Sequence, residues 1–132
     1  MNALGIAAVI GTAFFIDYNY RQIQKQPKIF VREALPNNLN AMCFPPFGIF
    51  VTEEQKDNGN LLEHELVHWE QYQRLGLIPF YLQYVGECVF YGYDHSPMEI
   101  EARFNECEYC RLNYSECVRN GMAVTVFNPN FR

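Results

Sequence analysis

The sequence predicts a predominantly helical α+β domain, with two or three short strands followed by three helices. Two short runs of β-branched and aromatic residues indicate strands, KIFVRE at 28–33 and GIFVT at 48–52. After residue 60, apolar residues recur at helical spacing in three successive segments, which indicates helices. Gly76 and the sequence DHSP at 94–97 separate these segments.

Length and composition are those of one globular domain. The chain has 132 residues, 49% hydrophobic and 19% charged, which is enough for a single core. We expect one domain over residues 1–132, made of an apolar N-terminal segment (1–27), a core (28–120) and a C-terminal strand or tail (121–132). The net charge of −5 and the lack of a basic cluster argue against nucleic-acid binding.

The N-terminal segment contains an apolar run at residues 3–16, ALGIAAVIGTAFFI. The run is shorter than the ~20 residues of a membrane-spanning helix. No Lys or Arg precedes it and no Ala-x-Ala site follows it, so no cleavable signal peptide is evident. We expect a helix or strand buried in this protein, or else a helix inserted into a partner or a larger assembly. A membrane anchor is the least expected of the three.

The core elements are bounded by turn and capping residues. Residues 34–42 are turn-rich, and Pro45 and Pro46 confine the strand at 48–52 to a sheet edge or a strand start. The three expected helices span residues 61–75, 79–93 and 97–120. Asn60 is the expected N-cap of the first helix and Ser96 that of the third.

The stretch LLEHELVHWEQY at 61–72 contains the sequence His-Glu-x-x-His. On a helix, residues four apart lie on the same face, so His64 and His68 can bind one metal ion through their imidazole nitrogens. Glu65 lies ~100° around the helix from His64, where it can reach a metal-bound water without itself binding the metal. Zn²⁺ is the ion that this arrangement favours, with Glu65 as general base for hydrolysis.

A catalytic zinc ion needs a third protein ligand, and HSPMEIEAR at 95–103 offers two candidates. Glu99 lies in the first turn of the helix that Pro97 begins, and Glu101 lies on the opposite side. Ala102 is small and shares a face with Glu99, which would let this helix approach the His64/His68 helix closely. We therefore choose Glu99 as the third ligand.

These residues resemble the gluzincin metallopeptidases, in which two histidines of one helix and a glutamate of the next bind zinc. The resemblance assigns His64, His68 and Glu99 as zinc ligands and Glu65 as general base. The segments HELVHWEQ, FYLQYVGE and EIEA also resemble short, uncharacterised zincin-like proteins of bacteria and their phages. This second resemblance covers Ile49 to about Arg119, a little over half of the chain, and we place it in a minimal zincin-like core at 28–120.

One departure from the family is Arg103, where gluzincins often carry an Asp that orients a zinc-binding histidine. Another carboxylate would have to replace it; the candidates are Glu70, Glu87 and Glu106. The family also stabilises the oxyanion of the reaction with a His, Tyr or Arg. The candidates here are His95, Tyr91, Tyr93 and Arg103, and we prefer His95 as the second catalytic residue.

Several nearby residues have structural roles in our interpretation. Trp69 and Tyr72 are expected to pack in the core, and Gln71, on the metal-facing side, to hydrogen-bond a neighbouring helix. The chain has five cysteines, an odd number that cannot all pair, and we expect reduced thiols. Cys107 and Cys110 have the spacing of a metal-binding pair, but Cys107 and Cys117 recur with Ile100, Phe104 and Tyr114 on one apolar helix face, which favours a core role.

The favoured function is a zinc-dependent metallopeptidase-like hydrolase that acts on a peptide or protein substrate. An open groove beside Glu65, lined by the strand at 48–52, would hold the substrate. The alternative is a structural or assembly component, for example of a virus particle, that keeps the scaffold with a structural or vestigial metal site. A third possibility is an enzyme inhibited by its own tail or N-terminal segment. The expected location is an intracellular reducing compartment or a virus particle.

Overall fold

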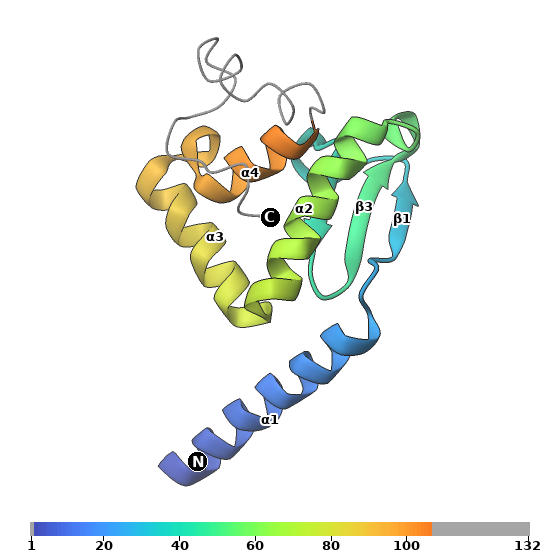
Figure 1. Ribbon diagram of the computed structural model, residues 1–132. Coiled ribbons are helices and arrows are strands. Elements are labelled where there is room, and N and C mark those ends of the chain that lie inside the picture. Colours follow the sequence, from blue (N-terminus) through green and yellow to red (C-terminus); the bar gives the residue numbers. More distant parts are fainter. Residues whose placement is uncertain (1, 107–132) are drawn as a thin grey trace.

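The structure is a computed structural model, and it describes residues 2–106. The helices and strands, in chain order, are α1 (Ala3–Ile23), β1 (Ile29–Arg32), β2 (Ala41–Phe44), β3 (Gly48–Thr52), α2 (Gly59–Leu75), α3 (Leu77–Tyr91) and α4 (Pro97–Glu106). The sheet lies on one side of α2, and α3 and α4 lie on the other (Figure 1). The predicted class, a predominantly helical α+β fold, is confirmed.

The sheet has the strand order β1-β3-β2, with β1 parallel and β2 antiparallel to β3. Of the two expected placements of 48–52, the sheet edge is wrong, because β3 lies in the centre, and the prolines lie just before the start of the strand. Pro45 and Pro46 fall in the turn between β2 and β3, so neither removes a hydrogen-bond donor from β3. Strand β2, at the end of the turn-rich segment, was not predicted, and it forms an edge of the sheet.

The helix starts differ from the predicted ones in two places. Helix α2 begins at Gly59, and its N-cap is Asn58, whose side chain accepts from the Leu61 N–H, in place of Asn60. Helix α3 begins at Leu77 because Asp17 Oδ2 of α1 accepts a hydrogen bond from the Leu77 N–H at 3.0 Å. This N–H is one of the donors at a helix start that have no partner within their own helix. The predicted extension of the third helix to residue 120, and the segment 121–132, lie outside the described residues.

The core lies where α2 meets α3 and α4. Trp69, Tyr72, Phe80 and Met98 form one buried cluster, in which Trp69 and Tyr72 contact edge to face with centroids 5.0 Å apart. The predicted packing role of Trp69 and Tyr72 is therefore confirmed. Ala102 is fully buried, and its small side chain lets α4 pack closely against its neighbours.

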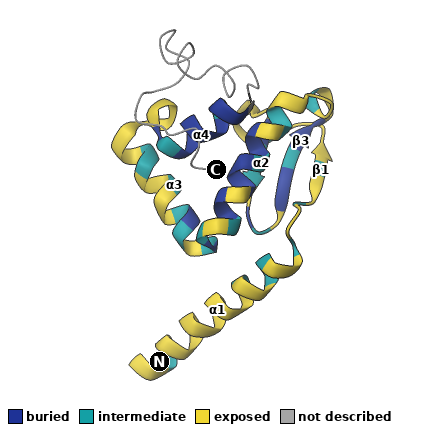
Figure 2. Ribbon diagram, in the orientation of Figure 1, coloured by how far each residue is buried: buried dark blue, intermediate teal, exposed yellow. Residues whose placement is uncertain are grey.

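Helix α1 projects from the body and has no buried residue (Figure 2). Its C-terminal end is bonded to the rest of the described chain: Asp17 accepts from the Tyr72 hydroxyl at 3.0 Å, and the Tyr20 hydroxyl donates to the Pro46 carbonyl at 2.7 Å. The expectation that residues 3–16 are buried in this protein is wrong for the described part of the chain. By length and composition, α1 could cross a membrane, a property that it shares with signal sequences.

We predict that Gly48→Ala destabilises the fold by on the order of 2 kcal/mol. Gly48 has φ +147°, and a Cβ there would lie 2.3 Å from the Lys28 carbonyl oxygen, which accepts from the Ile49 N–H. Urea unfolding followed by the fluorescence of Trp69, the chain's one tryptophan, measures the free energy of unfolding.

The matched control is Gly86→Ala on α3, where an added Cβ meets nothing within 4 Å. This variant should be about 0.5–1 kcal/mol more stable than the parent, because alanine favours a helix interior. Equal unfolding midpoints for the two variants would contradict this account of the β1–β3 contact.

Candidate metal centre

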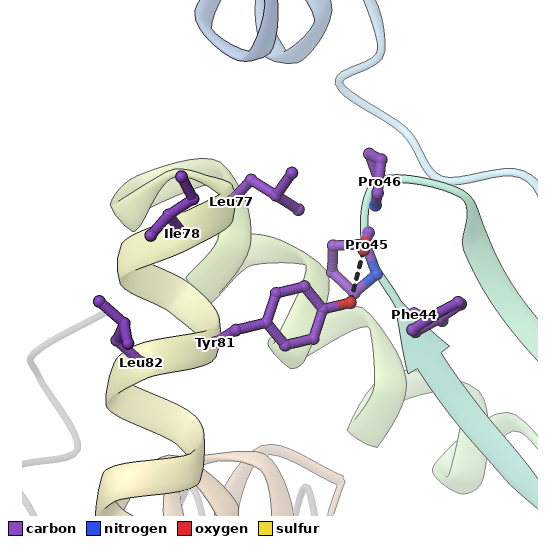
Figure 3. Close-up of a pocket in the computed structure, with 7 residues that line it drawn as sticks. All are labelled: Phe44, Pro45, Pro46, Leu77, Ile78, Tyr81 and Leu82. Carbon is purple, nitrogen blue, oxygen red and sulfur yellow. Dashed lines mark hydrogen bonds between the residues drawn. The ribbon is translucent and has the colours of Figure 1, made fainter. Parts of the chain in front are cut away.

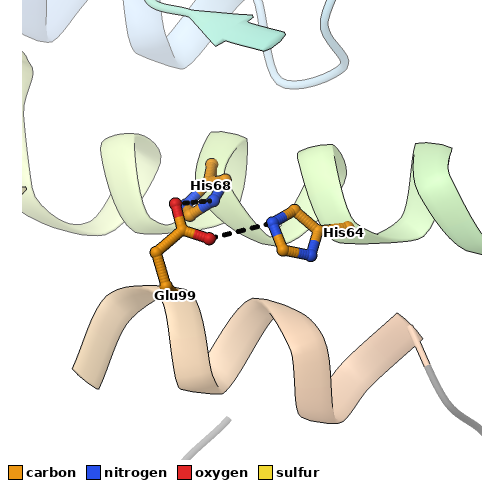
Figure 4. A group of neighbouring side chains, drawn as sticks. All are labelled: His64, His68 and Glu99. Atoms are coloured by element: carbon orange, nitrogen blue, oxygen red, sulfur yellow. Dashed lines mark hydrogen bonds and ion pairs between the residues drawn. The ribbon is translucent and has the colours of Figure 1, made fainter. Parts of the chain in front are cut away.

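The three predicted ligand residues come together between α2 and α4 (Figure 4). His64 and His68 lie one turn apart on α2, and Glu99 lies in the first turn of α4. His64 Nε2 is 3.0 Å from Glu99 Oε2, and His68 Nε2 is 3.1 Å from Glu99 Oε1. The potential ligand atoms of the three residues all lie within 4.8 Å of one another.

These distances suit a small tetrahedral cation. Zinc binds imidazole nitrogen and carboxylate oxygen at ~2.0–2.2 Å, so neighbouring ligand atoms around it are ~3.3 Å apart. The separations of 3.0 and 3.1 Å between each histidine and Glu99 lie near that value, although they involve the two different carboxylate oxygens, and the whole set of ligand atoms lies within 4.8 Å. A donor set of two imidazoles and one carboxylate is typical of zinc sites that keep a fourth position open.

Gln71 fixes the orientation of the His68 ring. Its amide Nε2 donates to the Met98 carbonyl at 3.0 Å and to Glu101 Oε2 at 3.2 Å, and both of these oxygens only accept. The amide oxygen of Gln71 must therefore face His68, whose Nδ1–H donates to it at 2.9 Å. With Nδ1–H held by Gln71, a neutral His68 ring would present the lone pair of Nε2 to a zinc ion, in place of the present contact between Nε2 and Glu99.

Glu99 is the acidic residue of α4 that faces the histidines. Its side chain is 1% exposed, and the Tyr84 hydroxyl donates to Oε1 at 2.6 Å. Burial raises the pKa of Glu99, but hydrogen bonds from His64, His68 and Tyr84 outweigh that effect, and the pKa lies well below its usual range. Glu101 instead faces Gln71, in agreement with the choice of Glu99 over Glu101.

Glu65 lies in a pocket of about 280 Å³ that His64, His68 and Glu99 also line. It is 7% exposed, and its carboxylate accepts a hydrogen bond from the Cys43 backbone N–H. Burial raises the pKa of Glu65, and this effect outweighs the opposing influence of the two histidines. The pocket thus holds a carboxylate with raised proton affinity next to the candidate ligands.

The strand beside the pocket is β2 and not the predicted strand at 48–52. Ala41, Met42 and Cys43 of β2 line the pocket, opposite Tyr81 and Tyr84 of α3. Because β2 pairs only with β3 in the described sheet, its outer edge faces the pocket, where the Cys43 N–H meets Glu65.

Of the four candidates for oxyanion stabilisation, Tyr93 is the one that lines the pocket. Tyr93 is 56% exposed, and the partial burial of its hydroxyl together with the nearby Glu99 raises its pKa to about 12, so the hydroxyl keeps the proton that it would donate. Arg103 is occupied with Asp94. His95 is exposed in the turn before α4 and is not among the lining residues, and its catalytic role stays a prediction.

The sequence did not predict the hydrogen bond from Tyr84 to Glu99, and it did not identify the residue that orients a histidine. Tyr84, which donates to Glu99, had only its helical spacing from Phe80 as a signal, and that spacing is equally typical of a core position. Of the carboxylates proposed to replace the family's Asp, Glu87 instead accepts from the Ser96 hydroxyl and the Met98 N–H at the start of α4. The amide of Gln71 contacts His68. Cys107 and Cys110 lie outside the described residues.

Comparison with protein-family models, with curated proteins and with solved structures gave no significant match. The likeness to gluzincins therefore stays a prediction that rests on the residues of the motif and on their geometry.

We predict that Gln71→Leu lowers the zinc affinity of the protein about 10–100-fold, because His68 loses the partner that fixes its tautomer and ring orientation. Competition with a chromogenic chelator measures the dissociation constant. Gln83→Leu is the control, since Gln83 is an exposed amide on α3 whose Nε2 donates to Glu87 Oε1 at 2.9 Å. Unchanged affinity in Gln71→Leu would show that His68 needs no such partner.

Proposed function

We propose that this protein is a zinc-dependent hydrolase of the metallopeptidase type, cleaving a peptide or amide bond. The observation that supports the proposal most strongly is the set of candidate ligands His64, His68 and Glu99 within 4.8 Å of one another. Zinc, when bound, would lower the pKa of a water molecule to about 7 and polarise the carbonyl of the substrate.

Glu65 is the proposed general base. A general base works best when its pKa approaches the working pH, and the burial of Glu65 raises its pKa in that direction. Its carboxylate would take the proton from the attacking water and pass it to the departing amine. The Cys43 N–H holds the carboxylate in the pocket, so the proton acceptor is oriented before the substrate arrives.

The edge of β2 supports a peptide as the substrate. An extended peptide can align with an exposed strand edge through main-chain hydrogen bonds, and side-chain pockets then select among sequences. Here that edge borders the pocket containing Glu65, with Tyr81 and Tyr84 on the opposite wall. The tyrosines offer apolar rings for contact with side chains of the substrate.

The alternative, an assembly component with a structural metal, draws support from the exposed apolar residues of α1 and α3. In that case the metal would mainly stabilise the fold. Three measurements on one protein preparation distinguish the two proposals: an assembly component binds zinc and melts at a lower temperature after chelation, but it hydrolyses no peptide.

We predict that Glu65→Gln keeps its zinc and loses at least about 100-fold in peptide hydrolysis, because the amide cannot take the proton. The assay uses casein and a mixture of unstructured peptides, with products identified by mass spectrometry. Glu63→Gln is the matched control, since Glu63 is exposed on the same helix.

Equal activity of Glu65→Gln and the parent would exclude Glu65 as the base. A zinc-loaded parent that is inert toward every peptide, yet stabilised by the metal, would overturn the hydrolase proposal in favour of the assembly component.

A further inference from the structure

Helix α1 is apolar around its whole circumference. Phe14, Phe15 and Ile16 are consecutive residues, so they point in directions ~100° apart, and they are 43%, 68% and 61% exposed. Leu4 and Val9, nearer the N-terminus, are 80% and 56% exposed. A helix that packs on one protein surface is apolar on one stripe, whereas this one requires apolar surroundings on every side.

Two polar side chains of α1, Thr12 and Asn19, donate to carbonyl oxygens of the helix itself. The Thr12 hydroxyl donates to the Ala8 carbonyl at 2.8 Å, and Asn19 Nδ2 donates to the Phe15 carbonyl at 2.8 Å. At the N-terminus, Asn2 Oδ1 accepts from the Gly5 N–H at 2.8 Å. Hydrocarbon offers no hydrogen bonds, so a helix placed in it must satisfy its polar groups in this way.

The charges of α1 are gathered at the end that contacts the body. Residues 3–16 contain no charged side chain, and the first charged residue, Asp17, pairs with Arg21 at 3.0 Å. Arg21 also donates to the Gln73 carbonyl at 3.0 Å, which fixes α1 to α2. Beyond this point Lys25 and Lys28 are exposed, where they could meet anionic headgroups.

A second apolar surface adjoins the same end of α1. Ile78, Leu82, Val85 and Val89 of α3 recur on one helix face and are 46%, 71%, 56% and 82% exposed. At its start, α3 borders an apolar groove of about 340 Å³, whose other wall is the turn before β3 (Figure 3). Both walls are bonded to α1, through the Pro46 carbonyl to Tyr20 and through the Leu77 N–H to Asp17.

We propose that the protein binds a lipid bilayer, with the apolar residues 3–16 of α1 inserted and the exposed face of α3 resting on the membrane surface. Residues 3–16 occupy the hydrocarbon and Tyr18 and Tyr20 the interface, where tyrosine is favoured. The 14 apolar residues from Ala3 to Ile16 extend ~21 Å at 1.5 Å per residue, which is shorter than the hydrocarbon thickness of ~30 Å, and a bilayer accommodates such a mismatch by thinning locally. A bilayer is favoured over a protein partner because it surrounds a helix on all faces.

The test reconstitutes the full-length chain from mild detergent into vesicles of phosphatidylethanolamine and phosphatidylglycerol, followed by an alkaline carbonate wash and flotation. The parent should float, and Ile10→Arg should partition about 100-fold less, because an arginine is costly in hydrocarbon. Ile29→Arg on β1 is the matched control and should float like the parent, since Ile10 and Ile29 are 50% and 52% exposed. Circular dichroism checks that all three are folded.

A parent that stays with the soluble fraction, or that forms a defined oligomer without detergent, would overturn the proposal in favour of a protein partner. Equal flotation of Ile10→Arg and Ile29→Arg would exclude insertion of α1. Removal of α1 from the membrane-bound protein during expression in a bacterial host, detected by N-terminal sequencing, would identify a signal sequence instead.

The contact of α3 has its own test. Leu82→Glu should dissociate from the vesicles several times more readily than the parent, because it places a charge in the apolar face. Gln83→Glu introduces the same charge at the next, exposed position and should bind like the parent. Equal binding of these two variants would remove α3 from the membrane contact. Neither test requires a bound metal, so their outcome is independent of the proposed hydrolase.

Discussion

The contact between the buried carboxylate of Glu99 and the two imidazoles of α2 is the interaction on which the rest of the site depends. A buried carboxylate is costly unless it is paired and hydrogen-bonded, and three side chains from two helices supply those bonds here. For Glu99 to face both histidines, α4 must pack against α2 at a fixed position along the axis of α2. Gln71 of α2 secures this position by donating to the Met98 carbonyl, and Glu87 of α3 fixes the same turn by accepting from the Met98 N–H.

The sheet contributes by placing β2 against the same helix. The Cys43 N–H reaches Glu65, so one edge strand both orients the proposed base and borders the space for a substrate. On the opposite wall, α3 provides Tyr84 to Glu99 and exposes its other face to solvent. The helix thus links the candidate metal centre to the surface that we propose rests on a membrane.

Local patterns in the sequence predicted most of the helices and the three candidate ligands. The spacing of His64 and His68 is set within one helix, and Pro97 places Glu99 in the first turn of another. What could not be predicted depends on contacts between distant residues. Strand β2 exists by pairing with β3, and α3 begins early because Asp17, 60 residues away from Leu77, accepts its N–H. The bonds of Gln71 and Tyr84 at the site arise only when three helices meet.

The central claim is that His64, His68 and Glu99 bind zinc, and the most direct measurement is the metal content of the purified, dialysed protein by elemental analysis. The account predicts one zinc ion per chain in the parent and in a His95→Ala control, whose histidine is exposed, and none in His68→Ala. A parent without zinc after refolding with the metal supplied, or a His68→Ala variant with as much zinc as the parent, would contradict it.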